Sequence, residues 1–144
     1  MDFSSFDLHP LIAAGVVAQG YETPTPIQAQ AIPPAIDGVD VLGLAQTGTG
    51  KTAAFALPIL DYLIDGPRKR VRALIVAPTR ELTQQIHDAF GALGAESGLR
   101  SVPIYGGVNI NPQIRQLRGG AEIVVACPGR LLDHLQQGTA DLSD

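Results

Sequence analysis

The chain has 144 residues, a length typical of one domain, and 45% of them are hydrophobic, which suffices for a sizeable core. Its net charge of −4 argues against a protein that holds nucleic acid by bulk electrostatic attraction. No apolar run reaches the roughly 18 residues of a membrane span, and the lone Cys127 excludes an internal disulfide partner, so we expect a cytoplasmic protein without a secretory leader.

Amphipathic stretches and short apolar runs alternate along the chain. A helix is predicted over 8–19 and a second over 26–36, where Thr25 is a suitable N-cap and Pro26 suits the first helical position. Pro33 and Pro34 are expected to kink or end this second helix early. A strand is predicted next, over Val39–Leu44, followed by a helix over 51–64.

The second half continues the alternation. Strands are predicted over 71–77, 101–105 and 122–126, and helices over 81–93, 112–117 and 130–137. The apolar runs are continuous rather than alternating, which is typical of parallel strands covered on both faces. The order of elements therefore predicts an α/β fold with a doubly wound parallel sheet flanked by helices.

The glycine-rich segment Ala45–Thr52 (AQTGTGKT) lies between a predicted strand and a predicted helix, the context of a phosphate-binding loop. Gly48 and Gly50 let backbone N–H groups approach phosphate oxygens without a Cβ clash. Lys51 places a charge on the β- and γ-phosphates, and the Thr52 hydroxyl is a ligand for Mg²⁺. By itself the loop predicts only a purine nucleoside triphosphate site, and leaves a kinase or GTPase open.

Five motifs, in the same order, resemble those of the DEAD-box RNA helicases. Gly20–Gln28 (GYETPTPIQ) is similar to the Q motif, and Phe3 stands where that family keeps an upstream aromatic residue. Ala45–Thr52 matches the family's P-loop, including its initial alanine. The remaining matches are Pro78–Leu82 (PTREL) with motif Ia, Gly106-Gly107 with the double-glycine motif, and Pro128–Arg130 with most of motif Ib. The run Gly106–Gln113 most resembles the bacterial RhlE-type branch.

The resemblance implies that the chain binds ATP and Mg²⁺. Lys51 and Thr52 are the implied catalytic residues, and Thr52 is the implied Mg²⁺ ligand. Gln28 can pair bidentately with adenine N6 and N7, and Phe3 would stack on the adenine ring. The full implied nucleotide site comprises Phe3, Tyr21, Pro26, Gln28, Gln46, Thr47, Gly48, Thr49, Gly50, Lys51, Thr52 and Ala53.

The resemblance also implies RNA contacts, by Pro78, Thr79, Arg80, Gly106, Gly107, Pro128, Gly129 and Arg130. These would touch the sugar-phosphate backbone, so binding is expected to be independent of sequence. Where motif Ib usually begins with threonine, this chain has Cys127, and a thiol is a weak donor. Either the backbone N–H of Cys127 contacts the phosphate, or this position contributes less.

We expect a Q-motif helical region over residues 1–38 and a partial N-terminal RecA-like P-loop NTPase domain over 39–144, truncated before its last strands. The sequence contains no Asp-Glu-Ala-Asp run, and the resemblance implies a second RecA-like domain outside it. The intact protein is then an ATP-dependent RNA helicase. We expect the 144 residues alone to be inactive, with exposed apolar faces. The alternative is a non-catalytic fragment that binds adenine nucleotide or RNA.

Overall fold

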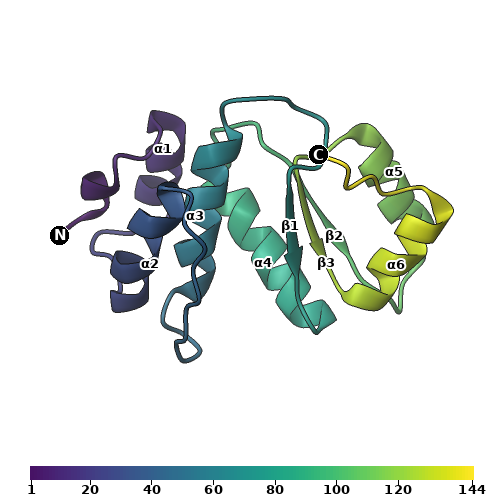
Figure 1. Cartoon of the computed structure of the whole chain (residues 1–144), viewed down its shortest axis with the longest axis horizontal. Helices are drawn as coiled ribbons and strands as arrows, with labels where there is room; N and C mark the ends of the chain where they lie inside the picture. The colour runs from purple at the N-terminus through teal and green to yellow at the C-terminus, as the bar shows by residue number, and fades with distance from the viewer. The chain divides into compact units, whose positions relative to one another are not determined.

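The computed structural model describes all 144 residues, which form two compact units (Figure 1). The first, here the N-terminal unit, comprises Met1–Asp65 and Ala92–Gly98. The second, here the sheet unit, comprises Gly66–Gly91 and Leu99–Asp144. The domain boundary expected near residue 38 stays a prediction.

Helices make up the N-terminal unit. A short 3₁₀-helix at Phe3–Phe6 precedes α1 (Pro10–Ala18), α2 (Pro26–Ile36) and α3 (Lys51–Leu63). Helix α2 begins at Pro26, directly after the N-cap Thr25, as the sequence predicts. The expected early stop is wrong, because α2 continues through Pro33 and Pro34 to Ile36. Each proline removes one N–H donor, to the carbonyl of Ala29 or of Gln30, yet the helix does not end there.

Apolar contacts between the helices form the core of this unit. Its fully buried side chains include Ile12, Val16, Ile32, Leu57, Leu60, Leu63 and Leu93. Burial of each large aliphatic side chain contributes roughly 1.5–3 kcal/mol. Gly15 brings α1 against the backbone of Leu93, since a Cβ at Gly15 would lie 1.9 Å from the Leu93 carbonyl oxygen. The backbone N–H of His9 donates to Oδ1 of Asp61 at 2.7 Å, which ties α1 to α3.

The strand predicted over Val39–Leu44 does not form. The segment has no regular secondary structure and does not join the three-stranded sheet. A strand needs a neighbour to pair its backbone groups, and this segment pairs with none of the three strands. Leu42 and Leu44 are therefore 89% and 86% exposed, which agrees with the expectation of exposed apolar side chains.

The sheet unit contains three strands and three helices in strict alternation. They are β1 (Ala73–Val76), α4 (Arg80–Leu93), β2 (Ser101–Ile104), α5 (Asn111–Gly119), β3 (Ile123–Ala126) and α6 (Pro128–Gln137). The strand order is β1-β3-β2, and both neighbouring pairs are parallel. The predicted α/β fold with a parallel sheet flanked by helices is therefore confirmed.

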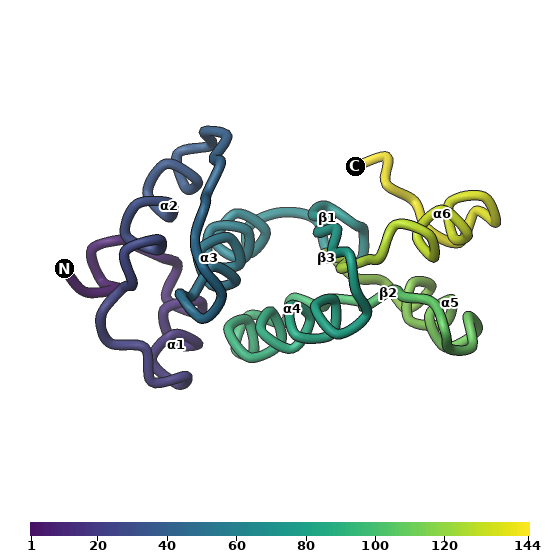
Figure 2. The backbone as a smooth tube through the Cα atoms, turned by 90° about the horizontal axis from the view of Figure 1, so that it is seen from below, coloured from purple at the N-terminus to yellow at the C-terminus, as the bar shows by residue number.

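Strand β3 is the centre of this unit, and all four of its residues are buried. Figure 2 shows α5 and α6 on one side of the sheet and α4 on the other. Val124 and Ala126 pack with β2, α5 and α6 in a single core cluster. By contrast β1 is an edge strand, and its Leu74 and Val76 are 41% and 55% exposed.

The loop before β1 is held by a buried carboxylate. Glu122, only 2% exposed, accepts hydrogen bonds from the backbone N–H of Lys69 at 2.6 Å and of Arg100 at 2.8 Å. Such bonds compensate the cost of burying its charge. Gly120 makes this approach possible, because it has a φ of +88° and an added Cβ would lie 2.6 Å from Cβ of Lys69.

Gly120→Ala is expected to destabilise the sheet unit by about 1–3 kcal/mol, because alanine adds both a strained φ and a clash with Lys69. Gly119→Ala is the matched control, since a Cβ there meets nothing within 4 Å. Gly119→Ala should leave the free energy of unfolding unchanged or raise it by up to about 1 kcal/mol. Urea unfolding followed by circular dichroism measures both, and equal effects of the two substitutions would contradict the role of Gly120.

Candidate functional site

The phosphate-binding loop has the backbone conformation that its glycines predict. Gly48 and Gly50 both have a φ of +82°, in the left-handed region that glycine favours. Helix α3 begins immediately afterwards, at Lys51, so its unpaired first-turn N–H groups lie next to the loop. Within the loop, Oγ1 of Thr49 donates to the carbonyl of Gln46 at 2.6 Å, and Nζ of Lys51 donates to the carbonyl of Ala45 at 2.7 Å.

Gln28 joins the Q motif to this loop. Its side chain is 3% exposed, and its Nε2 donates to the carbonyl oxygen of Gly50 at 3.1 Å. Its Oε1 accepts from the backbone N–H of Thr25 at 3.0 Å. A Cβ at Gly50 would lie 2.4 Å from Nε2 of Gln28, so only glycine allows this contact. Adenine pairing by Gln28 stays a prediction, and the amide keeps one N–H and one lone pair for it.

The predicted aromatic residues of the nucleotide site form a cluster. The ring of Phe3 lies 5.8 Å from that of Tyr21 and 5.6 Å from that of Phe6, measured between centroids. Phe3 is buried, whereas Tyr21 is 39% exposed. Stacking of Phe3 on adenine therefore stays a prediction. Of the other predicted residues, Pro26 is exposed at the start of α2, and Ala53 is buried in α3.

Thr52 is half-buried in the first turn of α3, at the position predicted for a Mg²⁺ ligand. No group of three or more His, Cys, Asp or Glu side chains gathers anywhere in the chain to hold a metal. Mg²⁺ commonly keeps several waters and binds through one or two protein ligands together with substrate phosphates. One hydroxyl beside a phosphate-binding loop fits that mode of binding.

The predicted RNA-binding residues come together at one edge of the sheet. Pro78–Arg80 follow β1, Gly106 and Gly107 follow β2, and Pro128–Arg130 follow β3. Because all three strands are parallel, their carboxyl ends share one edge, the edge at which open α/β sheets bind ligands. All of these residues are exposed except Arg130, which is half-buried.

Cys127 cannot offer its backbone N–H to a phosphate, because that group donates to the carbonyl of Ile104 at 2.8 Å. The first of the two possibilities for this position is therefore wrong. The thiol sulfur lies 3.2 Å from Oγ1 of Thr83 on α4, so it packs within the unit. The second possibility, that Cys127 contributes less to RNA binding than threonine would, stays a prediction.

Arg80 and Arg130 have different surroundings. Arg80 is exposed, and its guanidinium carbon lies 5.1 Å from the centroid of the Tyr105 ring. Arg130 instead donates from Nη2 to the carbonyl of Val108 at 3.0 Å and from Nη1 to Oε1 of Gln113 at 3.3 Å. Its side chain is only 14% exposed. Arg130 therefore braces the segment that follows the double glycine.

Two residues that the sequence analysis did not single out hold Arg130 in place. Gln113 is buried on α5, and His134 is fully buried on α6, with its Nε2 3.0 Å from Oε1 of Gln113. Since Nε2 of Gln113 donates to the carbonyl of Tyr105 at 2.9 Å, its Oε1 is the acceptor and His134 carries a proton on Nε2. Burial, and then the nearby Arg130, lower the pKa of His134, so its imidazole is neutral. No sequence periodicity marks either residue.

The sheet unit has the parallel α/β architecture typical of P-loop NTPases, and the N-terminal unit carries a glycine-rich loop that opens a helix. The profile of the DEAD/DEAH box helicase family matches residues 25–144. The chain belongs to this family, which excludes an unrelated P-loop kinase or GTPase. Separately, none of its helices is both long and apolar enough to span a membrane.

Similar proteins include the ATP-dependent RNA helicase DeaD of Mycobacterium tuberculosis, 51% identical over 98% of this chain and 25% of the relative. The ATP-dependent rRNA helicase RRP3 of Saccharomyces cerevisiae is 50% identical over 93% of this chain and 26% of its own length. The ATP-dependent RNA helicase RhlB of Xanthomonas oryzae is 47% identical over 94% of this chain and 25% of its own length. The chain thus spans about a quarter of the curated relatives it matches. The RhlE-type branch stays a prediction.

Among solved structures, the crystal structure of a DEAD box protein from the hyperthermophile Methanococcus jannaschii is similar, with a TM-score of 0.90 and 38% identity. The likeness covers 99% of this chain and 39% of that one. This likeness supports the α/β fold class that the parallel sheet indicates.

Proposed function

We propose that this chain is the ATP- and RNA-binding part of an ATP-dependent RNA helicase. The observation that carries the proposal is the hydrogen bond between Gln28 and Gly50. It brings the predicted base-reading residue against the phosphate-binding loop within the N-terminal unit. The names of the similar proteins support RNA unwinding as the activity of the intact protein.

In this proposal the loop binds the triphosphate of ATP. Backbone N–H groups around Gly48 and Gly50 and the amino end of α3 surround the phosphates. The ammonium of Lys51, which is exposed and bonded to the Ala45 carbonyl, exchanges that partner for a phosphate oxygen. Thr52 supplies one hydroxyl ligand to Mg²⁺, which neutralises charge on the phosphates when bound.

Hydrolysis and unwinding are proposed to need residues beyond these 144. Phosphoryl transfer depends on groups that orient the attacking water and stabilise the developing charge. The 144 residues contain no Asp-Glu-Ala-Asp run, whose carboxylates the family resemblance assigns to this work. We therefore expect the chain alone to bind nucleotide and RNA without turnover, which is also the behaviour of the alternative, a non-catalytic fragment. A second RecA-like domain would supply the remaining groups in the intact protein.

RNA is proposed to lie across the carboxyl edge of the sheet. Arg80 is the exposed cation there, and Gly106 and Gly107 let the RNA backbone approach closely. The amino ends of α4 and α6 add N–H donors for phosphates. Arg130 contributes by holding the Gly107–Val108 segment. All of these contacts address the RNA backbone, so the binding is independent of sequence.

Lys51→Ala should weaken ATP binding by about 10–100-fold, because a charge-assisted contact to phosphate is lost. The matched control is Lys69→Ala, which removes the only other lysine of the chain and lies in the sheet unit. Lys69→Ala should change the dissociation constant for ATP by no more than about twofold. Fluorescent ATP-analogue titration of both variants measures this, and equal losses would argue against the proposed loop.

Gln28→Ala should lower the preference for ATP over GTP by about tenfold, because adenine N6 and N7 lose their partner. The substitution also removes the bond to Gly50, so both nucleotides should bind more weakly. The ratio of the two dissociation constants isolates base recognition from this structural effect. Gln30→Ala, at an exposed position of the same helix, is the control. If ATP and GTP lose the same affinity, Gln28 supports the loop and does not read the base.

Arg80→Gln should weaken binding of single-stranded RNA to the same extent for different sequences. The slope of log K against log salt should fall in magnitude by about 0.7–1, since one phosphate contact is lost. Arg118→Gln, which removes an exposed arginine of α5, should leave the slope unchanged. Fluorescence anisotropy at several salt concentrations tests this. A loss confined to one RNA sequence would contradict backbone recognition.

A further inference from the structure

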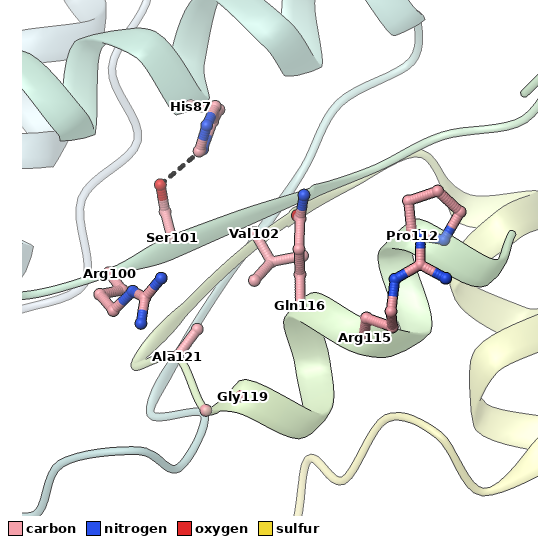
Figure 3. Close-up of a pocket in the computed structure, with 10 residues that line it drawn as sticks. His87, Arg100, Ser101, Val102, Pro112, Arg115, Gln116, Gly119 and Ala121 are labelled. Atoms are coloured by element: carbon pink, nitrogen blue, oxygen red, sulfur yellow. Dashed lines mark hydrogen bonds between the residues drawn. The ribbon is translucent and has the colours of Figure 1, made fainter. Parts of the chain in front are cut away.

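A groove of about 540 Å³ lies in the sheet unit, away from the carboxyl edge of the sheet. Its lining comes from α4, the start of β2, α5 and the segment just before β3 (Figure 3). Arg100, Ser101 and Ala121 stand at the amino ends of their strands, whereas the RNA motifs follow the carboxyl ends. None of the lining residues belongs to the proposed ATP or RNA sites. A volume of this size suits a nucleotide-sized ligand.

Two unpaired arginines line the groove. Neither Arg100 nor Arg115 has an ion pair, and both are exposed. In the view of Figure 3 Arg100 lies on one side of Val102 and Gln116, and Arg115 lies on the other side, close to Pro112. No carboxylate lines the groove. An arginine fork donates in the geometry that phosphate oxygens accept.

His87 and Ser101 add a neutral donor. Nδ1 of His87 lies 2.6 Å from Oγ of Ser101. If the hydroxyl donates, Nε2 of His87 carries a proton that is free for a ligand. If Nδ1 donates, the Ser101 hydroxyl proton is free instead. One donor is therefore left over in either tautomer. Burial lowers the pKa of His87, so the ring is neutral and adds no charge of its own.

Two carboxylates, those of Asp88 and Glu122, stand next to lining residues in the sequence but do not line the groove. Asp88, beside His87, accepts a hydrogen bond from Nε2 of Gln84. The buried Glu122 directs its carboxylate oxygens at the backbone N–H groups of Lys69 and Arg100. The carboxyl end of α5, at Gly119, carries a partial charge of about −0.5. Arg100 and Arg115 are the charged side chains that line the groove itself.

The outer side of β2, an edge strand of the sheet, is poorly suited to pairing with an added strand. The carbonyls of Arg100 and Ile104 accept hydrogen bonds from the segment of β3. Backbone groups of successive residues in a strand point to opposite sides, so those of Ser101 and Pro103 point away from β3. Pro103 has no N–H to pair with an added strand. The outward N–H of Ser101 instead adds another donor to the groove.

We propose that this groove is a second anion site, which binds a phosphate-bearing ligand through Arg100 and Arg115. The ligand has more than one anionic oxygen to offer, since two separate arginines line the groove. A free nucleoside phosphate and a nucleic-acid strand share this chemistry, and the experiment separates them.

The test is a titration of the 144-residue chain followed by amide NMR, which resolves each site. Inorganic pyrophosphate, a short single-stranded RNA and the same strand with uncharged methylphosphonate linkages are the three probes. Resonances of Ser101 and Ala121 report the groove, and those of Gly48 and Gly50 report the phosphate-binding loop. Failure of the proposed ATP site is thus distinguishable from failure of the groove.

Saturable shifts at Ser101 and Ala121 are expected with pyrophosphate or with RNA, and none with the uncharged strand. Tighter binding of one probe identifies the source of the phosphate. Arg100→Gln and Arg115→Gln should each weaken binding by about tenfold. Arg100→Lys, which keeps the charge but loses the fork, should have a smaller effect. Arg118→Gln, on α5 but outside the groove, is the matched control and should change nothing.

Both arginine side chains are exposed, so their substitution should leave the core packing intact. Unchanged dispersion of the remaining amide resonances verifies this for each variant. The proposal is overturned if the groove resonances stay still at millimolar concentrations of pyrophosphate and RNA. It is equally overturned if Arg118→Gln weakens binding as much as the two groove variants.

Discussion

Parallel pairing of β3 with strands on both sides is the constraint on which the sheet unit depends. β3 follows β2 in the chain but lies between β1 and β2, and its four residues are completely covered. Because the three strands run the same way, three loops far apart in sequence meet at one edge. Pro78, Gly106 and Pro128 become neighbours for this reason alone. A different strand order or direction would separate them.

The N-terminal unit depends on a smaller contact, at the carbonyl of Gly50. That oxygen accepts from the backbone N–H of Ala54, in the first turn of α3, and from Nε2 of Gln28 on α2. One acceptor thus links the phosphate-binding loop, the helix that follows it and the Q motif. Glycine is required there because its φ is positive and because Gln28 fills the space of a Cβ.

Exposed apolar side chains mark where this chain leaves its own surfaces uncovered. Leu42 and Leu44 are unpaired in the segment before the phosphate-binding loop, and Leu74 and Val76 are exposed on the edge strand β1. In an isolated domain such surfaces favour association with other chains. The segment before the loop reads as a strand in sequence because its residues are suited to burial. High strand propensity alone does not form a strand, since the backbone groups must pair with a neighbouring strand.

Local sequence patterns were sufficient for the helices, for three of the four predicted strands, for the parallel sheet and for the phosphate-binding loop. Each of these is encoded by nearby residues, through periodicity, capping and glycine placement. The same reasoning failed for Val39–Leu44 and left two roles open for Cys127, because both depend on strand pairing. It could not foresee the Gln113–His134 contact or the groove between Arg100 and Arg115. Those side chains come from separate elements, and only the packing of helices on the sheet brings them together.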